Sequence, residues 1–163
     1  MKKLFIIRHA KSSWDSDAKS DFDRPLNKRG KRDAPLMGEV LKELAVMPDL
    51  ILSSSAKRTT MTALILSEKI AYDKEIVFKD NLYLASDSEI FDIIKRVDDK
   101  ADSLFIIAHN PGVTNFINRF SDDYLSNLPT TGVFAIEFDV DSWKDIKPRS
   151  GKKLFFEYPK KHV

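Results

Sequence analysis

Two similar apolar runs constrain the fold more than any other feature of the chain. Residues 4–7 are followed by Arg8 and His9, and residues 104–108 end on His109. Such a run of bulky apolar residues, with polar or turn residues behind it, is typical of a strand buried on both faces. In open α/β sheets, ligands bind just beyond the carboxyl ends of such strands. We therefore expect both histidines at the mouth of one crevice.

The histidine content strengthens this expectation. The chain has three histidines, and two of them are His9 and His109. A single histidine at a strand end would be interpreted as a hydrogen-bonded structural residue. Two at equivalent strand ends, one of them beside Arg8, favour a phosphate site instead.

Length and composition predict one globular domain spanning residues 1–163. The net charge of +2, with both signs interspersed, argues against a nucleic-acid partner. The lack of cysteine excludes disulfides, thiolate catalysis and cysteine-ligated metals. No apolar stretch has the length of a membrane span and no signal peptide is recognisable, so we expect a cytoplasmic protein without a membrane partner. We also expect a monomer.

Strand and helix signals alternate along most of the chain. Strands are expected at residues 4–7, 50–53, 75–78, 104–107, 133–138 and 153–158. Helices are expected where apolar residues recur at helical spacing, after caps at Asp23 or Asn27, at Ser86 or Asp87, and at Asn110. The alternation predicts an α/β fold with three layers, αβα, around a mostly parallel central sheet. The polar segment 14–26 lacks a period and is expected to be a loop crossing the crevice.

A further helix is expected after the serine cluster at 53–55, which places Arg58 in its first turn. A cation there is poorly placed against the helix dipole. An anion in front of the helix would explain it, because helix N-termini bind phosphate. Arg58 could equally well be a surface residue whose unfavourable interaction with the helix dipole is screened by salt. This feature alone therefore leaves both interpretations open.

Four residues, Arg8, His9, Arg58 and His109, suit one chemistry if the fold brings them together. Guanidinium groups offer forked donors that match phosphate oxygens. A neutral imidazole can attack phosphorus and form a phosphohistidine intermediate that water later hydrolyses. The second imidazole, if protonated, can stabilise charge on the transferring group. Positive potential around His9 would keep it from accepting a second proton.

Other chemistries lack their patterns. Two histidines could bind zinc together with a carboxylate, but His-x-x-x-His and His-x-His spacings are missing, and the adjacent arginine would repel a cation. The chain has neither a Gly-x-Ser-x-Gly elbow nor a Gly-x-x-x-x-Gly-Lys loop. We therefore expect no metal and no cofactor.

In their order and spacing these residues resemble the histidine phosphatase superfamily, which includes the phosphoglycerate mutases. The resemblance is carried by Arg8-His9-Ala10, by Arg58 in a Ser-x-x-x-Arg-Thr helix start, and by His109 at a strand end. Ala10 stands where the family's Arg-His-Gly motif usually has glycine. The segment Asp-Arg-Pro-Leu at 23–26 and the turn at 129–132 resemble more closely the SixA-type phosphohistidine phosphatases.

The resemblance implies a phosphoglycerate mutase-like fold and a role for each matching residue. His9 would be the catalytic nucleophile, and Arg8 and Arg58 would be the phosphate clamp. His109 would be the second catalytic histidine of the pocket. Apart from the resemblance, Ser12 is a further candidate for phosphate binding.

One departure from the family bears on the substrate. Many members have a glutamate general acid where this chain has Asn81, with Asp80 next to it as the remaining candidate acid. An alkoxide leaving from a phosphate ester must be protonated as it departs. Phosphohistidine needs no such acid, because its other ring nitrogen can take up a proton near neutral pH. The missing glutamate therefore favours a phosphoramidate substrate.

These observations predict a cofactor-independent phosphatase that acts on phosphohistidine in a protein, such as a phosphotransfer domain or phosphocarrier in signal transduction. Two alternatives stay open. One is a phosphomonoesterase that acts on a small phosphate ester with Asp80 as the acid. The other is a non-catalytic module that binds a phosphorylated partner.

Overall fold

The two histidine-ended runs form adjacent strands of one sheet. In the computed structural model, which describes residues 1–163, β1 (Lys2–Arg8) pairs in parallel with β4 (Ser103–Ala108). Neighbouring side chains of β1 enter different hydrophobic clusters, because a strand alternates its two faces: Leu4 lies in one cluster and Phe5 in the other. Burial on both faces explains why the apolar run is uninterrupted.

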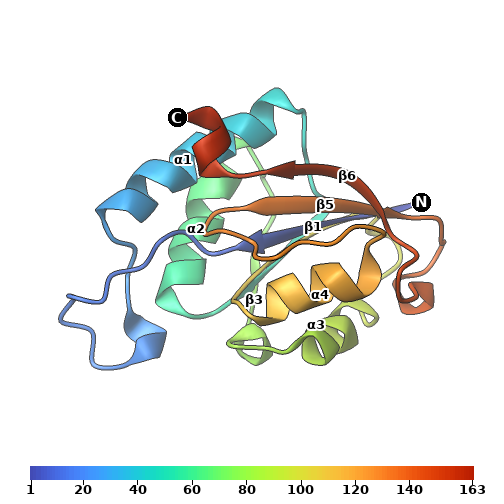
Figure 1. Cartoon of the computed structure of the whole chain (residues 1–163), viewed down its shortest axis with the longest axis horizontal. Coiled ribbons are helices and arrows are strands. Elements are labelled where there is room, and N and C mark those ends of the chain that lie inside the picture. The colour runs from blue at the N-terminus through green and yellow to red at the C-terminus, as the bar shows by residue number, and fades with distance from the viewer.

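The sheet is mostly parallel, as predicted. Its order is β3-β2-β4-β1-β5-β6, and Figure 1 shows β1, β5 and β6 next to one another in that order. The remaining strands are β2 (Leu50–Ser54), β3 (Val77–Lys79), β5 (Val133–Phe138) and β6 (Lys152–Glu157). Strands β1 to β4 run parallel to one another, whereas β5 is antiparallel to both β1 and β6. The edge strand β3 begins two residues later than the predicted strand at 75–78.

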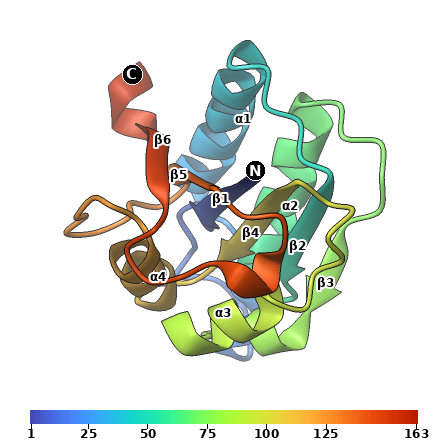
Figure 2. The ribbon, with the colours of Figure 1, turned by 90° about the vertical axis from the view of Figure 1, so that its right-hand side faces the viewer.

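Helices cover both faces of the sheet, which confirms the three-layer prediction. Figure 2 shows α1 (Lys28–Glu43) and α2 (Lys57–Lys69) on one side, and α3 (Asp87–Ile94) and α4 (Gly112–Phe120) on the other. The first pair packs into the cluster that contains Phe5, and the second pair into the cluster that contains Leu4. None of these helices is long and apolar enough to cross a membrane.

Two of the predicted helix caps are observed. The side chain of Asn27 accepts a hydrogen bond from the backbone N–H of Gly30 at 2.9 Å and so caps α1. Ser86 caps α3 in a reciprocal capping box. The alternative cap at Asp23 was wrong, because that residue lies in a short 3-10 helix, η1 (Asp21–Asp23), and its carboxylate accepts from Ser20.

The helices that carry the site begin close to their predicted positions. Helix α2 begins at Lys57 and places Arg58 in its first turn. Helix α4 begins at Gly112 rather than at Pro111, so it starts later than predicted. The Asn110 side chain still accepts from the backbone N–H of Thr114, at 3.3 Å.

Two glycines allow these elements to approach closely. A Cβ at Gly30 would lie 2.2 Å from the carbonyl oxygen of Lys11, so α1 starts directly against the segment that follows β1. A Cβ at Gly112 would lie 1.9 Å from the carbonyl oxygen of Ala85, where α4 meets the chain just before α3. Larger residues would separate these elements at the carboxyl ends of β1 and β4.

The polar segment after β1 projects beyond the carboxyl end of that strand and contains η1, as Figure 1 shows. Three other short 3-10 helices follow: η2 (Asp80–Leu82), η3 (Trp143–Asp145) and η4 (Pro159–His162). Of these, η2 packs beside β2 at the same end of the sheet as the two histidines.

Candidate active site

The parallel pairing of β1 with β4 brings His9 and His109 together. Arg8 pairs with Ala108 in the register of the two strands, and the histidines follow them. Their ring centroids lie 5.2 Å apart, and both residues are buried. The sequence predicted that these two histidines would converge, and the structure brings them together.

The hydrogen bonding of His9 defines its tautomer. Its Nδ1 lies 2.7 Å from the carbonyl oxygen of Ala10. A carbonyl oxygen can only accept, so Nδ1 carries the hydrogen and Nε2 keeps its lone pair. Nε2 is therefore the atom of this ring that can attack an electrophile.

The protonation state of His9 has two physical causes. Burial, first, and then the nearby guanidiniums of Arg58, Arg8 and Arg24 lower the pKa of His9 to about 3, against the opposing hydrogen bond to Ala10. The positive potential was predictable from the neighbouring residues in the sequence. The structure adds burial, which is the larger cause. The ring is neutral near pH 7 and can act as a nucleophile.

The second histidine is also neutral in the folded protein. Its Nε2 lies 2.8 Å from the Ser54 hydroxyl, and its Nδ1 is buried without a protein partner. Burial, followed by His9 and Arg58, lowers the pKa of His109 to about 3. The protonated form considered in the sequence analysis is therefore absent near pH 7. Instead, Nδ1 is the position from which this ring can donate to an oxyanion.

The two predicted clamp arginines lie at the same place. Arg58 is 3% exposed and Arg8 is partly buried. One terminal nitrogen of Arg8 donates to the carbonyl oxygen of Leu128 at 3.1 Å, while its Nε has no protein partner. The Nε of Arg58 is likewise without a partner. Each guanidinium thus retains donors that the protein does not use, as a phosphate clamp requires.

A short relay of hydrogen bonds ties α2 to the end of β1. The hydroxyl of Thr62 donates to the carbonyl oxygen of Arg58 at 2.7 Å and accepts from the backbone N–H of Ala10 at 3.0 Å. This link holds the first turn of α2 against the residue that follows His9.

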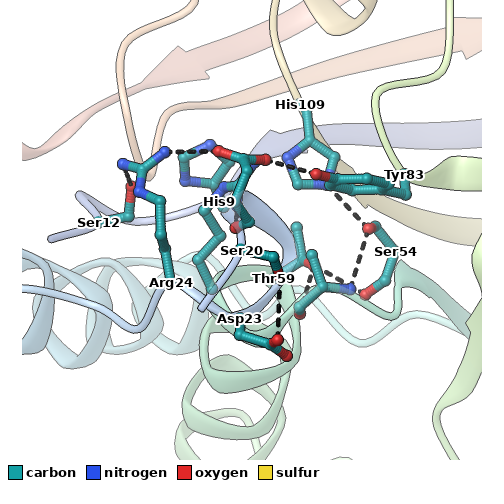
Figure 3. A network of polar contacts seen from close by, with 12 residues as sticks. His9, Ser12, Ser20, Asp23, Arg24, Ser54, Thr59, Tyr83 and His109 are labelled. Carbon is teal, nitrogen blue, oxygen red and sulfur yellow. Dashed lines mark hydrogen bonds and ion pairs between the residues drawn. The ribbon is translucent and has the colours of Figure 1, made fainter. Parts of the chain in front are cut away.

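Two weaker candidates from the sequence lie outside this convergence. The hydroxyl of Ser12 accepts from Arg24 at 2.5 Å, and Figure 3 shows Ser12 against Arg24 rather than against the histidine rings. Asp80 is exposed, accepts a hydrogen bond from the Ser55 hydroxyl, and makes no hydrogen bond or ion pair to the two histidines or the two clamp arginines. The roles predicted for these two residues stay predictions.

Sequence reasoning missed three residues of the site: Asp21, Arg24 and Tyr83. The carboxylate of Asp21 accepts from Arg24 at 2.8 Å, from Arg58 at 3.0 Å and from the Tyr83 hydroxyl at 2.5 Å. The Tyr83 ring stands edge-on to His109, with centroids 5.4 Å apart (Figure 3). The sequence predicted that segment 14–26 crosses the crevice. This prediction indicated the region that contains Asp21 and Arg24, but not the residues themselves.

The charges of this outer group are set by its own contacts. The hydroxyl of Tyr83 and the guanidiniums of Arg24 and Arg58 hold the pKa of Asp21 well below its usual range. Burial, followed by Asp21, raises the pKa of Tyr83. Near pH 7 Asp21 is a carboxylate and Tyr83 a neutral phenol.

Sequence comparison relates this chain to known proteins. The family model of the histidine phosphatase superfamily (branch 1) matches residues 4–83. An uncharacterized chloroplastic protein of Arabidopsis thaliana is 28% identical over 159 residues, which are 92% of this chain and 72% of that protein.

Solved structures show the same fold over nearly the whole chain. A protein designated phosphohistidine phosphatase SixA, from Agrobacterium tumefaciens, superposes with a TM-score of 0.83 at 24% identity, covering 97% of this chain and 98% of its own. The protein histidine phosphatase SixA complexed with tungstate gives a TM-score of 0.85 at 19% identity, covering 99% of each chain. The predicted phosphoglycerate mutase-like fold is confirmed.

The fold and the site define an α/β protein in which two histidines and two arginines from separate elements lie close together. The family model over residues 4–83 and the fold shared with SixA proteins support the histidine phosphatase superfamily. Family and structural neighbours together support a phosphatase.

The two neutral, buried histidines predict a dependence of stability on pH. In the folded protein each pKa is lowered to about 3, whereas in the unfolded chain it is the ordinary value near 6.5. Unfolding therefore takes up protons below about pH 6.5, so this contribution to stability is fully present above that pH and is lost as the pH falls toward 3. Well below pH 6.5, the expected slope is about 1.4 kcal/mol per pH unit for each ring.

Urea unfolding between about pH 7 and pH 5 measures this slope above the range in which carboxylates titrate. The variant His109→Gln should show about half of it. An equal slope in wild type and variant would contradict the assignment of a neutral, buried His109.

Proposed function

We propose that this protein hydrolyses phosphohistidine on a partner protein through a covalent phosphohistidine intermediate on His9. The observation that carries the proposal is the buried His9, whose Nε2 keeps its lone pair beside Arg8, Arg58 and His109. The similarity in fold to SixA proteins supports the choice of substrate class.

The first step transfers the phosphoryl group. Nε2 of His9 attacks phosphorus while the bond to the substrate's ring nitrogen breaks. The unused donors of Arg8 and Arg58, together with an N–H from His109, stabilise the charge on the phosphoryl oxygens. Water then hydrolyses the phosphoenzyme and releases phosphate.

The leaving group distinguishes phosphohistidine from a phosphate ester. An alkoxide needs a proton donor, and such a donor ordinarily contributes about 10²- to 10⁴-fold in rate. Asp21 is ionised, and Asp80 contacts Ser55 rather than the histidine pair. Neither carboxyl group is therefore placed to protonate a leaving alkoxide, which favours a substrate whose leaving imidazole ring already carries a proton.

A substrate comparison tests the proposal. The protein is incubated with a phosphohistidine-containing phosphocarrier, with phosphoserine and with a sugar phosphate, and phosphate release is followed. We expect kcat/KM for phosphohistidine to exceed that for the alkyl esters by at least about 10²-fold. This is the smallest usual contribution of a general acid, which the alkyl esters need and phosphohistidine does not.

The alternative functions give different results in the same experiment. Equal or faster turnover of an alkyl ester would indicate a phosphomonoesterase acting on small molecules. Tight phosphate binding, with neither release of phosphate nor a phosphoenzyme on rapid quench, would indicate a non-catalytic binding module.

A further inference from the structure

The carboxylate of Asp21 covers the outer edge of a buried clamp residue. Arg58 donates through one terminal nitrogen to the main-chain oxygen of Asp21 at 2.7 Å and through the other to its carboxylate at 3.0 Å. The side chain of Asp21 is 42% exposed, whereas that of Arg58 is 4% exposed. Asp21 therefore lies on the solvent side of the pocket, with Arg58 beneath it.

Groups from four elements surround this carboxylate. Arg24 follows η1 itself, Arg58 comes from α2, Tyr83 follows η2, and His109 follows β4. Because the first three donate hydrogen bonds to it, the carboxylate stays ionised and holds a defined position. The guanidiniums of Arg8, Arg24 and Arg58 together outweigh its single negative charge, so the pocket still attracts a phosphoryl group.

The leaving group must lie on the same side as Asp21. In an in-line transfer the nucleophile and the leaving group are on opposite sides of phosphorus. His9 is 8% exposed, whereas the side chain of Asp21 is 42% exposed. The substrate's ring therefore departs toward solvent, the side on which Asp21 and the Tyr83 hydroxyl that donates to it lie.

A fixed carboxylate on that side favours one kind of leaving group. It repels a departing alkoxide, but it can accept a hydrogen bond from a ring N–H. We propose that Asp21 determines substrate specificity by accepting a hydrogen bond from the ring N–H of the substrate histidine. This inference rests on the proposed function and adds a residue that recognises the leaving group.

The step balances without an added acid. The bond between phosphorus and the substrate's ring nitrogen breaks, and its electron pair returns to that nitrogen. A new bond forms between phosphorus and Nε2 of His9. The proton stays on the other nitrogen of the substrate ring, which leaves as neutral imidazole, and Asp21 neither gains nor loses a proton. By favouring the protonated ring, Asp21 extends activity to higher pH.

Asp21→Asn tests this role because it removes the charge but keeps the shape. We expect kcat/KM for a phosphohistidine protein to fall about 10- to 100-fold, as for a lost charge-assisted hydrogen bond. The alkaline limb of the pH profile should move to lower pH. Inhibition by inorganic phosphate, which has no imidazole, should be unchanged or stronger. Asp21→Glu should restore the wild-type pH profile.

Asp23→Asn is the matched control. It removes the same charge from the same short helix, where Asp23 is exposed and contacts Ser20 at 2.9 Å. This variant should behave as wild type.

Two results would overturn the inference. Phosphate inhibition that weakens in parallel with turnover in Asp21→Asn would show that Asp21 only supports Arg58. Unchanged turnover of phosphohistidine, with an unchanged pH profile, would show that it has no part in recognition. Failure of the wild type to hydrolyse phosphohistidine would instead reject the proposed function itself.

Discussion

Replacing His9 with alanine should eliminate the phosphoenzyme and reduce phosphohistidine turnover by about 10³-fold or more, as removal of a nucleophile does in other covalent enzymes. The reason is chemical. His9 presents an unprotonated Nε2 because Ala10 accepts the hydrogen of Nδ1 and because burial prevents a second protonation. The partner His109 has one nitrogen engaged by Ser54, so it is not an equivalent replacement. Rapid quench with labelled substrate measures both the intermediate and the rate.

The third histidine provides the control for this variant. His162 lies in η4 and contacts Glu157 at 2.5 Å, away from the pocket. His162→Ala should therefore leave turnover and phosphoenzyme formation unchanged. Labelled phosphoenzyme persisting in His9→Ala would contradict the assignment of the nucleophile.

The centre of the site could be predicted because it depends on strong, local signals. Uninterrupted apolar runs predict central strands that are buried on both faces of a sheet. If two such strands are adjacent and parallel, the residues at their carboxyl ends lie near one another. That reasoning placed His9 beside His109. The position of Arg58 followed from a helix start, which is also a local signal.

The outer part of the site depends on tertiary packing and could not be predicted in the same way. Segment 14–26 has no period, so nothing in it indicated that Asp21 would reach Arg58 on α2. In the segment that begins at Asp80, the sequence suggested Asp80 as the functional residue, whereas in the structure Tyr83 contacts His109. This could not be predicted, because a single 3-10 turn has no periodicity from which side-chain direction can be read.

Protonation states were only partly accessible for a related reason. The positive potential around His9 follows from the identity of its neighbours, so its direction was predictable. Burial depends on the packed structure and lowers the pKa of both rings further. It also changes the expected role of His109 from a cation to a neutral donor.

The second large effect is expected for Arg58→Lys, which keeps the charge but removes the forked geometry. Arg58 donates from both terminal nitrogens to Asp21 and keeps its Nε for another partner. A lysine side chain carries all of its donors on one ammonium nitrogen at the end of a flexible chain, so it cannot make all of these contacts at once. We expect kcat/KM for phosphohistidine to fall by about 10²- to 10³-fold, as for the loss of an oxyanion donor.

Arg119→Lys is the matched substitution, because Arg119 also pairs with an aspartate, Asp87, at 3.1 Å but lies on α4 outside the pocket. Arg119→Lys should leave activity unchanged.

Arg58→Lys is expected to weaken inhibition by phosphate and to slow turnover. The two effects must occur together, because one guanidinium both binds the phosphoryl group and stabilises its charge during transfer. If turnover fell while phosphate affinity stayed at the wild-type value, Arg58 would act on the transition state alone. If neither changed, the positive charge without the fork would be sufficient, and the clamp would have to be assigned to Arg8.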